Sequence, residues 1–543
     1  MKTALDTILD YHQRTKHHIQ KYAAGPDFLD WDSQPEPFRT FTGSNLLELP
    51  LVGNKVQPLY EDLFKPGGVA IQEFSLSNIA ALLELSYGLS AWKQYENTRW
   101  ALRCNPSSGN LHPTEAYLVI QGCNGISDGV HHYMSRGHLL EQRCRFTSSK
   151  QVFPPDSFLI GLSSIHIRES WKYGERAFRY CQHDAGHAIA ALRYAAATLG
   201  WQVHLPDTWG DAEIGAVLGL DRDADFASVE REFPDLMLLV TTPLAVENRF
   251  LFTADGLLKA AQNGEWQGHA NILSPEKPIH WPVIEQASLA CIKPRTQPAV
   301  RQNPSIPNPL STDCKLSAVQ IIKQRRSAQK FDGNTMISAS VFYRMLDMTL
   351  PRTDIAPWDA IDWKPRIHLF IFVHRVEGIV PGLYLFLRNN HIEEQMRVEL
   401  SAEFEWLPVA GCPEHFSLFL LLEADMQKAA RTLSCHQNIA SHGAFSLGML
   451  GEYQASLSLN PWVYRQLFWE AGMLGQVLYL EAEAANMRGT GIGCYFDDEV
   501  HDLLGIKSQA FQSMYHFTVG GAITDNRLQT LPAYEHIPRN VMI

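Results

Sequence analysis

The chain has 543 residues and a formal net charge of −12, with 45% hydrophobic and 19% charged residues. That length is too great for one hydrophobic core and predicts at least two domains. The negative charge argues against nucleic acid and anionic membranes as partners, because both require a basic surface. Nine scattered cysteines without a Cys-x-x-Cys pair, and the lack of an apolar leader or a membrane-length apolar run, lead us to expect reduced thiols in the cytoplasm.

A polar loop is the first segment with recognisable chemistry. It covers residues 103–117 and leads into an apolar, β-rich run at residues 116–120. Two prolines, a permissive glycine and several short donors and acceptors would let this loop lie flat against a planar polar ligand. Composition alone favours an ordinary turn before a strand. The residues that would contact such a ligand are Arg103, Pro106, Ser107, Ser108 and Asn110.

An aromatic and basic segment precedes a helix in the first half. Residues 170–180 read Ser-Trp-Lys-Tyr-Gly-Glu-Arg-Ala-Phe-Arg-Tyr. Apolar residues then recur on one helical face over residues 189–199, and Gly200 is placed to end that helix. His183 and His187 stand four residues apart, but no third ligand follows at a familiar spacing. We therefore expect no metal site here, and histidines that pack in the core.

A proline-rich stretch separates two halves of the chain. Residues 271–310 contain eight prolines, which predicts an extended connector without folded elements. We expect a first domain at residues 1–265, a linker at 266–310 and a second domain at 311–543. Amphipathic helices mixed with short apolar runs in each half indicate an α+β fold, with helices packed on a small sheet.

The second half starts with a basic motif after a short helix. A helical run at residues 318–324 is followed by Arg325, Arg326 and Ser327. A dibasic pair in this position is usually a solvated cap that interacts with the helix dipole. A later amphipathic helix is expected to begin near Leu474.

Three pairs of matching segments occur in the same order in the two halves. They are 129–142 with 382–395, 184–186 with 470–472, and 211–220 with 497–506. The first pair is offset by 253 residues and the other two by 286, so the second half holds an insertion of 33 residues. One such match could arise by chance. Three in the same order predict a tandem duplication.

The polar loop at residues 103–117 resembles the flavin-contacting loop of the nitroreductase-like FMN enzymes, with its pattern Pro-Ser-Ser-x-Asn-x-x-Pro. The longer pattern Arg-x-x-Pro-Ser-x-Gly-x-Leu-x-Pro-x-Glu-x-Tyr is similar to their azoline-dehydrogenase, or SagB-type, branch. Segments 12–17 and 29–37 also resemble signatures of that branch. The resemblance covers most of residues 11–250 and, more loosely, 315–525.

In that family FMN lies in the interface of a two-fold dimer. One subunit binds the phosphate with an Arg-Arg-Ser motif, and the other supplies the Pro-Ser-Ser-x-Asn loop. Here the first motif occurs in the second half as Arg325, Arg326 and Ser327, while residues 356–364 replace the loop there. The resemblance thus implies a tandem duplicated nitroreductase-like fold that forms an intramolecular pseudo-dimer, with one composite FMN site and one decayed site. The arginines would pair with the phosphate, and the loop would hydrogen-bond the flavin.

Two more cofactor contacts follow from the resemblance. Residues 490–497 are similar to the strand end that passes flavin N5, although Cys494 and Tyr495 stand where most members have a smaller residue. Arg527 occupies the place where the family often has another phosphate cation. Its counterpart in the first half, Arg249, would serve the decayed site.

The segment 170–180 closely resembles the Trp-Lys-Tyr-Gly-x-Arg-Ala-x-Arg-Tyr segment of the azoline dehydrogenases, whose Lys-Tyr pair is implicated in catalysis. The resemblance implies that Lys172 and Tyr173 accept the proton lost during ring oxidation. A lysine in a dry pocket has a lowered pKa, and a tyrosine hydroxyl can orient or relay a proton. Without the resemblance, a solvated lysine among core aromatics would be the better interpretation.

Three functions remain open at this point. The first is an FMN-dependent oxidoreductase that oxidises azoline-type rings in a modified peptide or a small molecule. The second is an NAD(P)H-dependent reductase of nitro or quinone compounds. No Gly-x-Gly-x-x-Gly pattern of a Rossmann dinucleotide site follows a strand, so NAD(P)H would dock only transiently over the flavin. The third is a degenerate flavin-binding scaffold that docks a partner.

Overall fold

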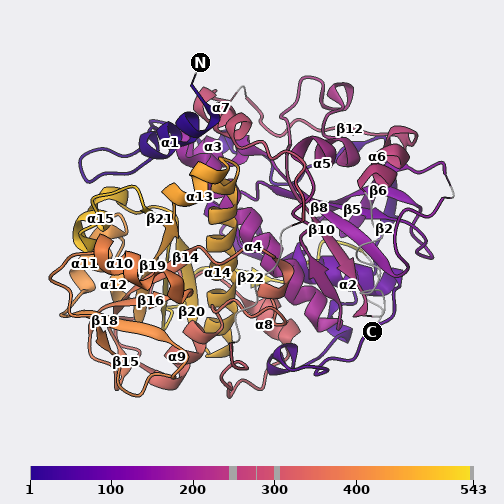
Figure 1. The fold of residues 1–543 in the computed structure, drawn as a ribbon. Helices are drawn as coiled ribbons and strands as arrows, with labels where there is room; N and C mark the ends of the chain where they lie inside the picture. Colours follow the sequence, from indigo (N-terminus) through magenta and orange to yellow (C-terminus); the bar gives the residue numbers. More distant parts are fainter. Residues whose placement is uncertain (1, 149, 244–253, 277, 299–305, 539–543) are drawn as a thin grey trace.

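A computed structural model describes residues 2–148, 150–243, 254–276, 278–298 and 306–538. It shows two α+β halves side by side, with two long helices between their sheets (Figure 1). The expected α+β class is confirmed. In these ranges no helix combines the length and the apolar character needed to cross a membrane.

An antiparallel sheet forms the centre of the first half. Its strand order is β7-β6-β5-β8-β10-β9, with β2 and β11 joined to β7. Side chains of β5 alternate between two cores, as the period of a strand requires: Leu118 and Ile120 share one with α4, and Tyr117 and Val119 share the other with α5 and α6. The strands are β2 (Asn45–Glu48), β5 (Thr114–Ile120), β6 (Gly129–Met134), β7 (Leu139–Arg145), β8 (Ser157–Ser164), β9 (Gln202–His204), β10 (Phe233–Thr241) and β11 (Glu265–Trp266).

The sheet of the second half has the same topology. Its order is β18-β16-β14-β19-β21-β20, with β17 joined to β18. Taken in chain order, its six main strands occupy the same places as β5 to β10 in the first sheet. The strands are β14 (Ile367–Val373), β16 (Gly382–Leu387), β17 (Leu407–Pro408), β18 (Ser417–Glu423), β19 (Phe445–Glu452), β20 (Arg488–Ile492) and β21 (Phe511–Gly520).

Two of the three sequence matches, and the start of the remaining one, fall on equivalent elements of the two halves. Residues 139–142 belong to β7, but their partners 392–395 lie at the start of α10, so the end of the first match is not structurally equivalent. The first begins at β6 and at β16, the second lies in α4 and α14, and the third begins α5 and α15. The extra residues of the second half form α10, α11, α12 and β17, between β16 and β19. The shared strand order of the two sheets agrees with the tandem duplication that the sequence predicts.

Helices α4 (Ala177–Thr198) and α14 (Val463–Ala484) pack against each other at the centre of the molecule. They approach most closely at two glycines: a Cβ on Gly186 would stand 2.2 Å from the Trp469 carbonyl oxygen, and one on Gly472 would stand 2.2 Å from the carbonyl oxygen of His183. Both helices begin earlier in the chain than their periodicity predicts. They are buried on nearly every side, so no single apolar face marks their first turns.

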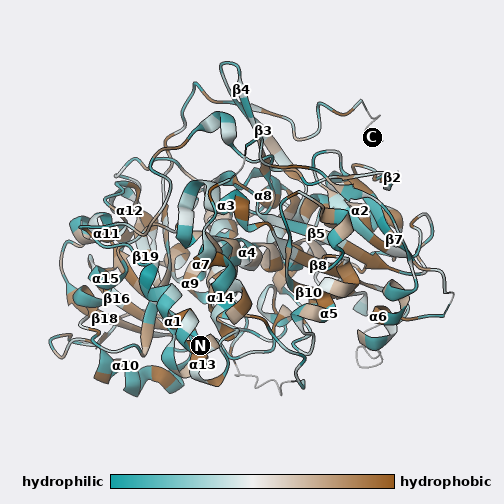
Figure 2. Cartoon of the chain, turned by 90° about the horizontal axis from the view of Figure 1, so that it is seen from above, coloured by the Kyte–Doolittle hydropathy of each residue, from teal (hydrophilic) through white to brown (hydrophobic). Residues whose placement is uncertain are grey.

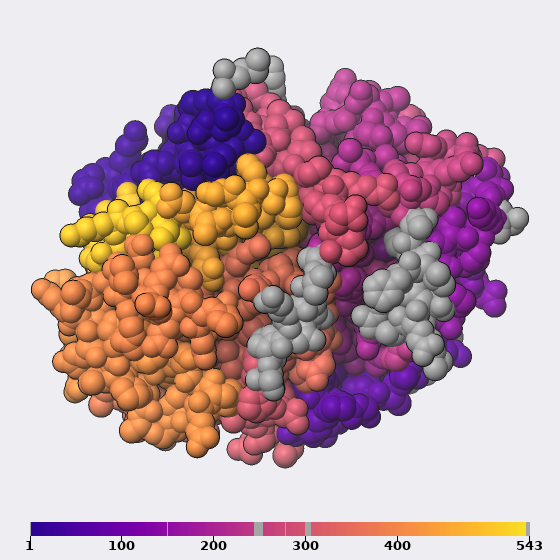
Figure 3. Space-filling model, in the orientation of Figure 1, coloured from indigo at the N-terminus to yellow at the C-terminus, as the bar shows by residue number. Residues whose placement is uncertain are grey.

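The N-terminal segment crosses to the second half. Lys16 forms an ion pair with Asp498 at 2.6 Å, and the backbone N–H of His17 donates to Asp497 at 2.9 Å. Burial favours the neutral form of Asp497, but the charges of Arg176 and Arg179 outweigh it and hold the Asp497 pKa at about 2. The N-terminal surface accordingly lies against the C-terminal part of the second half (Figure 3).

The C-terminal segment makes the reverse crossing. Strand β22 (Gln529–Leu531) pairs with β3 (Leu89–Tyr95) of the first half, and β3 pairs with β4 (Thr98–Arg103) in a hairpin that projects from the body of the molecule (Figure 2). The hydroxyl of Tyr534 accepts from the Leu89 backbone N–H at 2.8 Å. Each half therefore carries a terminal segment of the other.

The proline-rich segment is not the wholly extended connector that its composition predicts. Residues Pro282–Ala290 form helix α7, which packs against α1 (Ala4–Arg14) through buried side chains such as Ile284 and Ala287. Pro282 stands in the first turn of that helix, where a backbone N–H would have no partner within the helix in any case. The number of prolines in this segment therefore does not exclude a helix. Residues 299–305 of the connector lie outside the described ranges.

The remaining elements surround the sheets. The helices are α2 (Leu76–Ser86), α3 (His166–Tyr173), α5 (Asp211–Leu218), α6 (Ala254–Gln262), α8 (Ala318–Gln324), α9 (Ala339–Asp347), α10 (Glu393–Glu399), α11 (Gln427–Leu433), α12 (Ile439–His442), α13 (Gln454–Leu459) and α15 (Asp497–Leu504). The short strands are β1 (Phe41–Thr42), β12 (His269–Ala270), β13 (Ile337–Ser338) and β15 (Val376–Glu377).

Candidate functional site

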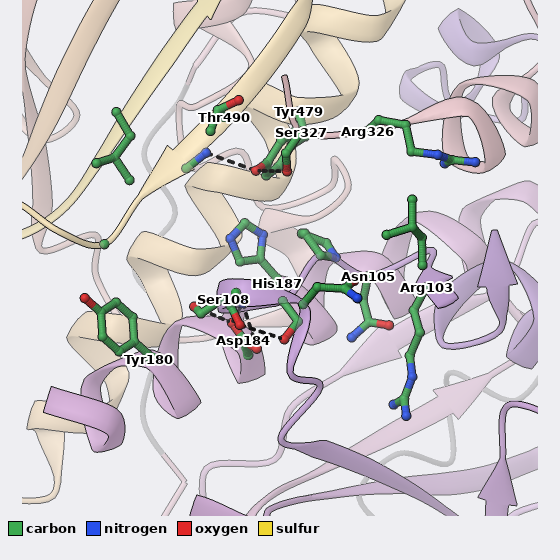
Figure 4. A pocket seen from close by; sticks show the side chains of 18 of the residues that line it. Arg103, Asn105, Ser108, Tyr180, Asp184, His187, Arg326, Ser327, Tyr479 and Thr490 are labelled. Carbon is green, nitrogen blue, oxygen red and sulfur yellow. Dashed lines mark hydrogen bonds between the residues drawn. The ribbon is translucent and has the colours of Figure 1, made fainter. Parts of the chain in front are cut away.

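A cavity of about 410 Å³ opens between the two halves. The polar loop of the first half lines one wall, and the Arg-Arg-Ser segment of the second half lines another (Figure 4). The two motifs that the sequence separates by more than 200 residues thus meet at one site. Other lining residues are Lys93, Tyr173, Tyr180, Asp184, His187, Tyr479, Gly491, Cys494, Tyr515 and Leu528.

The polar loop has a compact backbone shape. Gly109, Asn110 and His112 all have positive φ angles, of 58°, 60° and 54°. A Cβ on Gly109 would stand 2.6 Å from the hydroxyl oxygen of Tyr173, so the tyrosine ring packs directly on this glycine. Glycine at this position therefore permits both the backbone conformation and the contact with Tyr173.

The polar side chains of the loop already have protein partners. The Ser108 backbone N–H and hydroxyl both donate to the Asp184 carboxylate at 3.0 Å. The Asn110 amide donates to the Ala101 carbonyl oxygen at 2.9 Å, and the Ser107 hydroxyl accepts from the backbone N–H of His112 at 2.8 Å. These bonds fix the loop, and leave the remaining hydroxyl lone pairs and the backbone to face a ligand. Asn110 also lines the cavity, and one of its two amide N–H groups is used by the bond to Ala101.

Arg325 and Arg326 form the cationic wall of the cavity. Arg325 is buried; one of its terminal nitrogens donates to the Arg103 carbonyl oxygen at 3.2 Å, and its Nε has no hydrogen-bond partner in the described chain. Arg326 donates to the carbonyl oxygens of Lys323 and Ser90, at 2.8 and 3.2 Å. Within the described ranges neither guanidinium forms an ion pair with a carboxylate.

The surrounding charges make this wall an anion site. Burial, together with the charges of Arg325 and Arg488, lowers the pKa of Arg326 to about 10. Burial and the charges of Arg326 and Arg488 also lower the pKa of Lys93, which lines the cavity. Like charges held together without matching carboxylates repel each other, and a bound anion would relieve that repulsion.

A hydrogen-bonded group supports the opposite side of the cationic wall. The hydroxyls of Ser327 and Tyr479 lie 2.8 Å apart, and Tyr479 accepts from the Gly491 backbone N–H at 3.0 Å. The Tyr479 ring lies 5.0 Å from the Arg325 guanidinium carbon. Tyr479 therefore joins the Arg-Arg-Ser segment to strand β20, and only the tertiary structure reveals this role.

Arg103 lines the cavity and Tyr495 does not, and the ends of both side chains are bound elsewhere. The Arg103 guanidinium donates to the carbonyl oxygens of Thr114 and Pro37, at 3.2 and 2.7 Å. The Tyr495 ring is buried and stacks on His516, with centroids 4.5 Å apart. Cys494 does line the cavity. Of Cys494 and Tyr495, only Cys494 can present its side chain to a ligand in the cavity.

Arg527 is not brought to the cavity. Its side chain is 72% exposed and pairs with Asp525 at 2.7 Å, while its neighbour Leu528 is the residue that reaches the cavity wall. The additional cation expected there is instead Lys93, from β3. A local Asp-x-Arg pair satisfies Arg527 on the surface, which explains the difference. Arg249 lies outside the described residues.

Lys172 and Tyr173 are the last two residues of helix α3, and only Tyr173 reaches the cavity. Tyr173 lines the cavity, whereas Lys172 is half-buried behind it, with its Nζ 5.4 Å from the Tyr173 ring centroid. Burial lowers the pKa of Lys172 and raises that of Tyr173. The structure thus places the tyrosine next to a ligand and the lysine one side chain further away.

Two histidines of α4 contact residues of the second half. His183 stacks on Tyr515, with ring centroids 4.2 Å apart, and its Nε2 lies 2.9 Å from the Met514 carbonyl oxygen. His187 lies 3.2 Å from the Tyr515 hydroxyl and also lines the cavity. No group of three potential metal ligands occurs among the residues described. His183 packs in the core as expected, whereas the cavity position of His187 was missed.

The second half uses the position equivalent to the polar loop for packing. Trp358 is buried, its ring lies 4.5 Å from the Arg388 guanidinium carbon, and its indole N–H donates to the Met348 carbonyl oxygen at 2.8 Å. The neighbouring Asp359 forms a bidentate ion pair with Arg193, at 2.7 and 2.8 Å. Residues 358 and 359 of the segment 356–364 therefore bind other side chains and backbone groups of the chain itself.

Comparisons with known proteins give the fold its name. No protein-family model matches the chain. A Methanocaldococcus jannaschii protein named as a candidate nitroreductase is 22% identical over 175 residues, or 31% of this chain and 80% of that protein. A solved structure of a candidate nitroreductase from Anabaena variabilis covers 95% of this chain and 99% of its own, with a TM-score of 0.69 and 20% identity. The chain therefore has a nitroreductase-like fold.

Structures similar to smaller parts of the chain include flavin complexes. One, a candidate nitroreductase from Exiguobacterium sibiricum solved with FMN, covers 39% of this chain and 92% of its own, at 11% identity and a TM-score of 0.23. That similarity is too low for positions to be compared between the two proteins.

Proposed function

We propose that the chain is an FMN-dependent oxidoreductase that binds one flavin in the composite cavity. The observation that carries this proposal is the meeting of Arg325 and Arg326, from one half, with the polar loop of the other half across a single cavity. Each motif alone has an ordinary explanation as a turn or a helix cap. Their convergence does not follow from either explanation.

The residues present fit FMN. The cavity volume falls in the range of about 300 to 1,000 Å³ that is typical of small-molecule and cofactor sites. A phosphate would give the buried Nε of Arg325 a partner, and would relieve the repulsion of Arg326 with Arg325 and with Lys93. The loop and Cys494 would then flank the ring system with backbone groups and short side chains.

The cofactor would supply hydride chemistry, and the protein would supply orientation and proton transfer. We propose azoline-type rings of a modified peptide or small molecule as substrates. This rests on the resemblance of residues 170–180 and on the position of Tyr173 at the cavity wall. Tyr173 would orient the ring next to Gly109, and Lys172 behind it would keep the local charge balanced.

Reduction of nitro or quinone compounds with NAD(P)H is the second candidate, favoured by the fold shared with the Anabaena structure. The two functions differ in how the flavin responds to electron donors. Rapid bleaching of the bound flavin by NAD(P)H would indicate the reductase. A flavin that resists NAD(P)H but is bleached by a thiazoline-containing peptide would indicate the dehydrogenase.

The first test is the ratio of FMN to protein in the purified chain, from visible absorbance and released flavin. We expect one FMN per chain, and its loss in the Arg325→Ala/Arg326→Ala double variant. A chain that binds no FMN when the cofactor is added would contradict the proposed function. Two FMN per chain would contradict the decayed second site.

A further inference from the structure

Two buried carboxyl groups lie behind the polar loop. Asp184 on α4 lines the cavity and is 1% exposed, and Glu169 on α3 is fully buried. Asp184 accepts hydrogen bonds from the backbone and hydroxyl of Ser108, and the Ser107 side chain also acts on it, whereas both oxygens of Glu169 have no hydrogen-bond partner in the described chain. Neither residue forms an ion pair with any described residue. Burying a charged carboxylate without a cation is costly, so burial favours the protonated form of both groups.

The second half provides an internal comparison. Glu470 occupies the position of α14 that matches Asp184 in α4. It forms an ion pair with Arg388 and accepts from the backbone N–H groups of Arg366 and Ile367, at 3.0 and 3.2 Å. A fully neutralised carboxylate at this position serves packing in the decayed half. At the matching position of the first half, Asp184 has no cation partner among the described residues and lines the cavity.

The charges around the pair set the order in which it loses protons. Burial raises the pKa of Asp184 to about 7, although hydrogen bonds from Ser107 and Ser108 oppose the rise. Burial raises the pKa of Glu169 further, helped by the charge of Asp184 and opposed by that of Lys172. Near neutral pH, Asp184 therefore exchanges its proton while Glu169 keeps its own. Other titratable groups near the pair include Tyr173, Tyr180, Cys181 and Tyr515, whose pKa values burial raises, and His187, whose pKa burial lowers to about 3, so all are uncharged at this pH.

We propose that Asp184 exchanges the proton of the reaction with a substrate in the cavity, and that Glu169 and Lys172 link Asp184 to solvent. The inference rests on the proposed function. It supplies the step that Lys172, which does not line the cavity, cannot perform directly. The charges of Asp184 and of the half-buried Lys172 both act on the Glu169 carboxyl, so Glu169 is the group through which the other two are electrostatically coupled.

The proton balance of the step is simple. In the oxidation of an azoline ring, one C–H bond loses a hydride, whose acceptor is the proposed flavin. The adjacent C–H bond loses a proton to an Asp184 carboxylate oxygen, and that carbon's electron pair forms the new double bond. In the reverse direction protonated Asp184 returns the proton. The Ser108 hydroxyl, which donates to the ionised carboxylate, holds it in place.

The pair can be tested in the chain without added cofactor. Infrared difference spectra between about pH 5 and about pH 9 report the C=O band of protonated carboxyl groups. We expect one carboxyl to lose its proton near pH 7 in the wild type, and this step to be absent in Asp184→Asn. A second carboxyl should remain protonated above that pH and be absent in Glu169→Gln. Persistence of either signal in its variant would overturn the inference.

A matched control is available in the same half. Asp235 is also buried, with a pKa raised by burial to about 6, but it bonds Ser164 and Gln182 and does not line the cavity. Asp235→Asn should remove a step near pH 6 and leave the Asp184 step unchanged. Glu169→Gln removes no hydrogen bond, so it remains informative if Asp184→Asn fails to fold.

The flavin-loaded chain supplies a separate test. We expect Asp184→Asn to keep its FMN while turnover falls about 100-fold or more and loses its pH dependence near 7. Glu169→Gln should keep that pH dependence but turn over more slowly, with a larger solvent isotope effect. An unchanged pH profile in Asp184→Asn would refute the role of Asp184. A chain that holds no FMN but shows both infrared signals would refute the proposed function alone.

Discussion

Replacing Arg325 with methionine should separate cofactor binding from stability. The side chain is buried, has one hydrogen bond to the Arg103 carbonyl oxygen at 3.2 Å, and lies beside the charge of Arg326. Methionine has a similar length and carries no charge. Because an uncompensated buried cation is removed, the unfolding midpoint of the cofactor-free variant should equal or exceed that of the wild type.

The affinity for FMN should fall at the same time. A charge-assisted hydrogen bond is worth about 1.5 to 3 kcal/mol, which corresponds to a loss of about 10- to 150-fold in affinity for FMN. The cation–π contact with Tyr479, at 5.0 Å, is lost in both the free and the bound variant and cancels. Fluorescence titration gives the Kd, and thermal unfolding with saturating FMN gives the ligand-dependent stabilisation.

Arg527→Met is the matched control. That arginine also stands near the C-terminal β22, but it is exposed and pairs with Asp525 on the surface. Its variant should bind FMN with wild-type affinity. If Arg325→Met bound FMN as tightly as Arg527→Met, or unfolded well below the wild type without ligand, the assignment of the cationic wall would be refuted.

Three further predictions concern the packing of α4 on α14, the pH dependence of stability at Asp497, and the turnover of variants at Tyr173 and Lys172. Gly186→Ala would place a methyl group 2.2 Å from the Trp469 carbonyl oxygen, so unfolding experiments should show a loss of about 1 to 3 kcal/mol or more and a lower FMN content. Asp497→Asn leaves two buried arginines unpaired and should cost about 3 to 5 kcal/mol at neutral pH. Because folding lowers the pKa of Asp497 to about 2, its contribution is present above the unfolded pKa, and the difference between variant and wild type should vanish as the pH falls through about 2. Tyr173→Phe should keep FMN and the packing on Gly109, while turnover of a thiazoline-containing peptide falls. Lys172→Met should reduce turnover less, because Lys172 lies outside the cavity. Equal turnover in Tyr173→Phe and the wild type would contradict this order.

Sequence by itself indicated the α+β class and the repeat, because both leave local signals. The matches that begin at residues 129 and 211 could be read from residue identity alone. They begin at equivalent strands and helices, although the end of the first match pairs residues of β7 with residues of α10. The Arg325–Ser327 segment and the loop around Ser108 were likewise recognisable as motifs. Their convergence on one cavity was an expectation that needed the fold.

Tertiary structure decided what each side chain of those motifs faces. A residue's place in a motif does not fix its rotamer, so the Tyr495 ring entered the core and Arg527 paired with Asp525 on the surface. Lys93 and Asp184 reach the cavity from elements distant in sequence, and no local pattern marks them as site residues. Charge and burial are sums over neighbours from every part of the chain. For that reason the uncompensated cations and the unpaired carboxyl groups become visible only when the two halves are packed together.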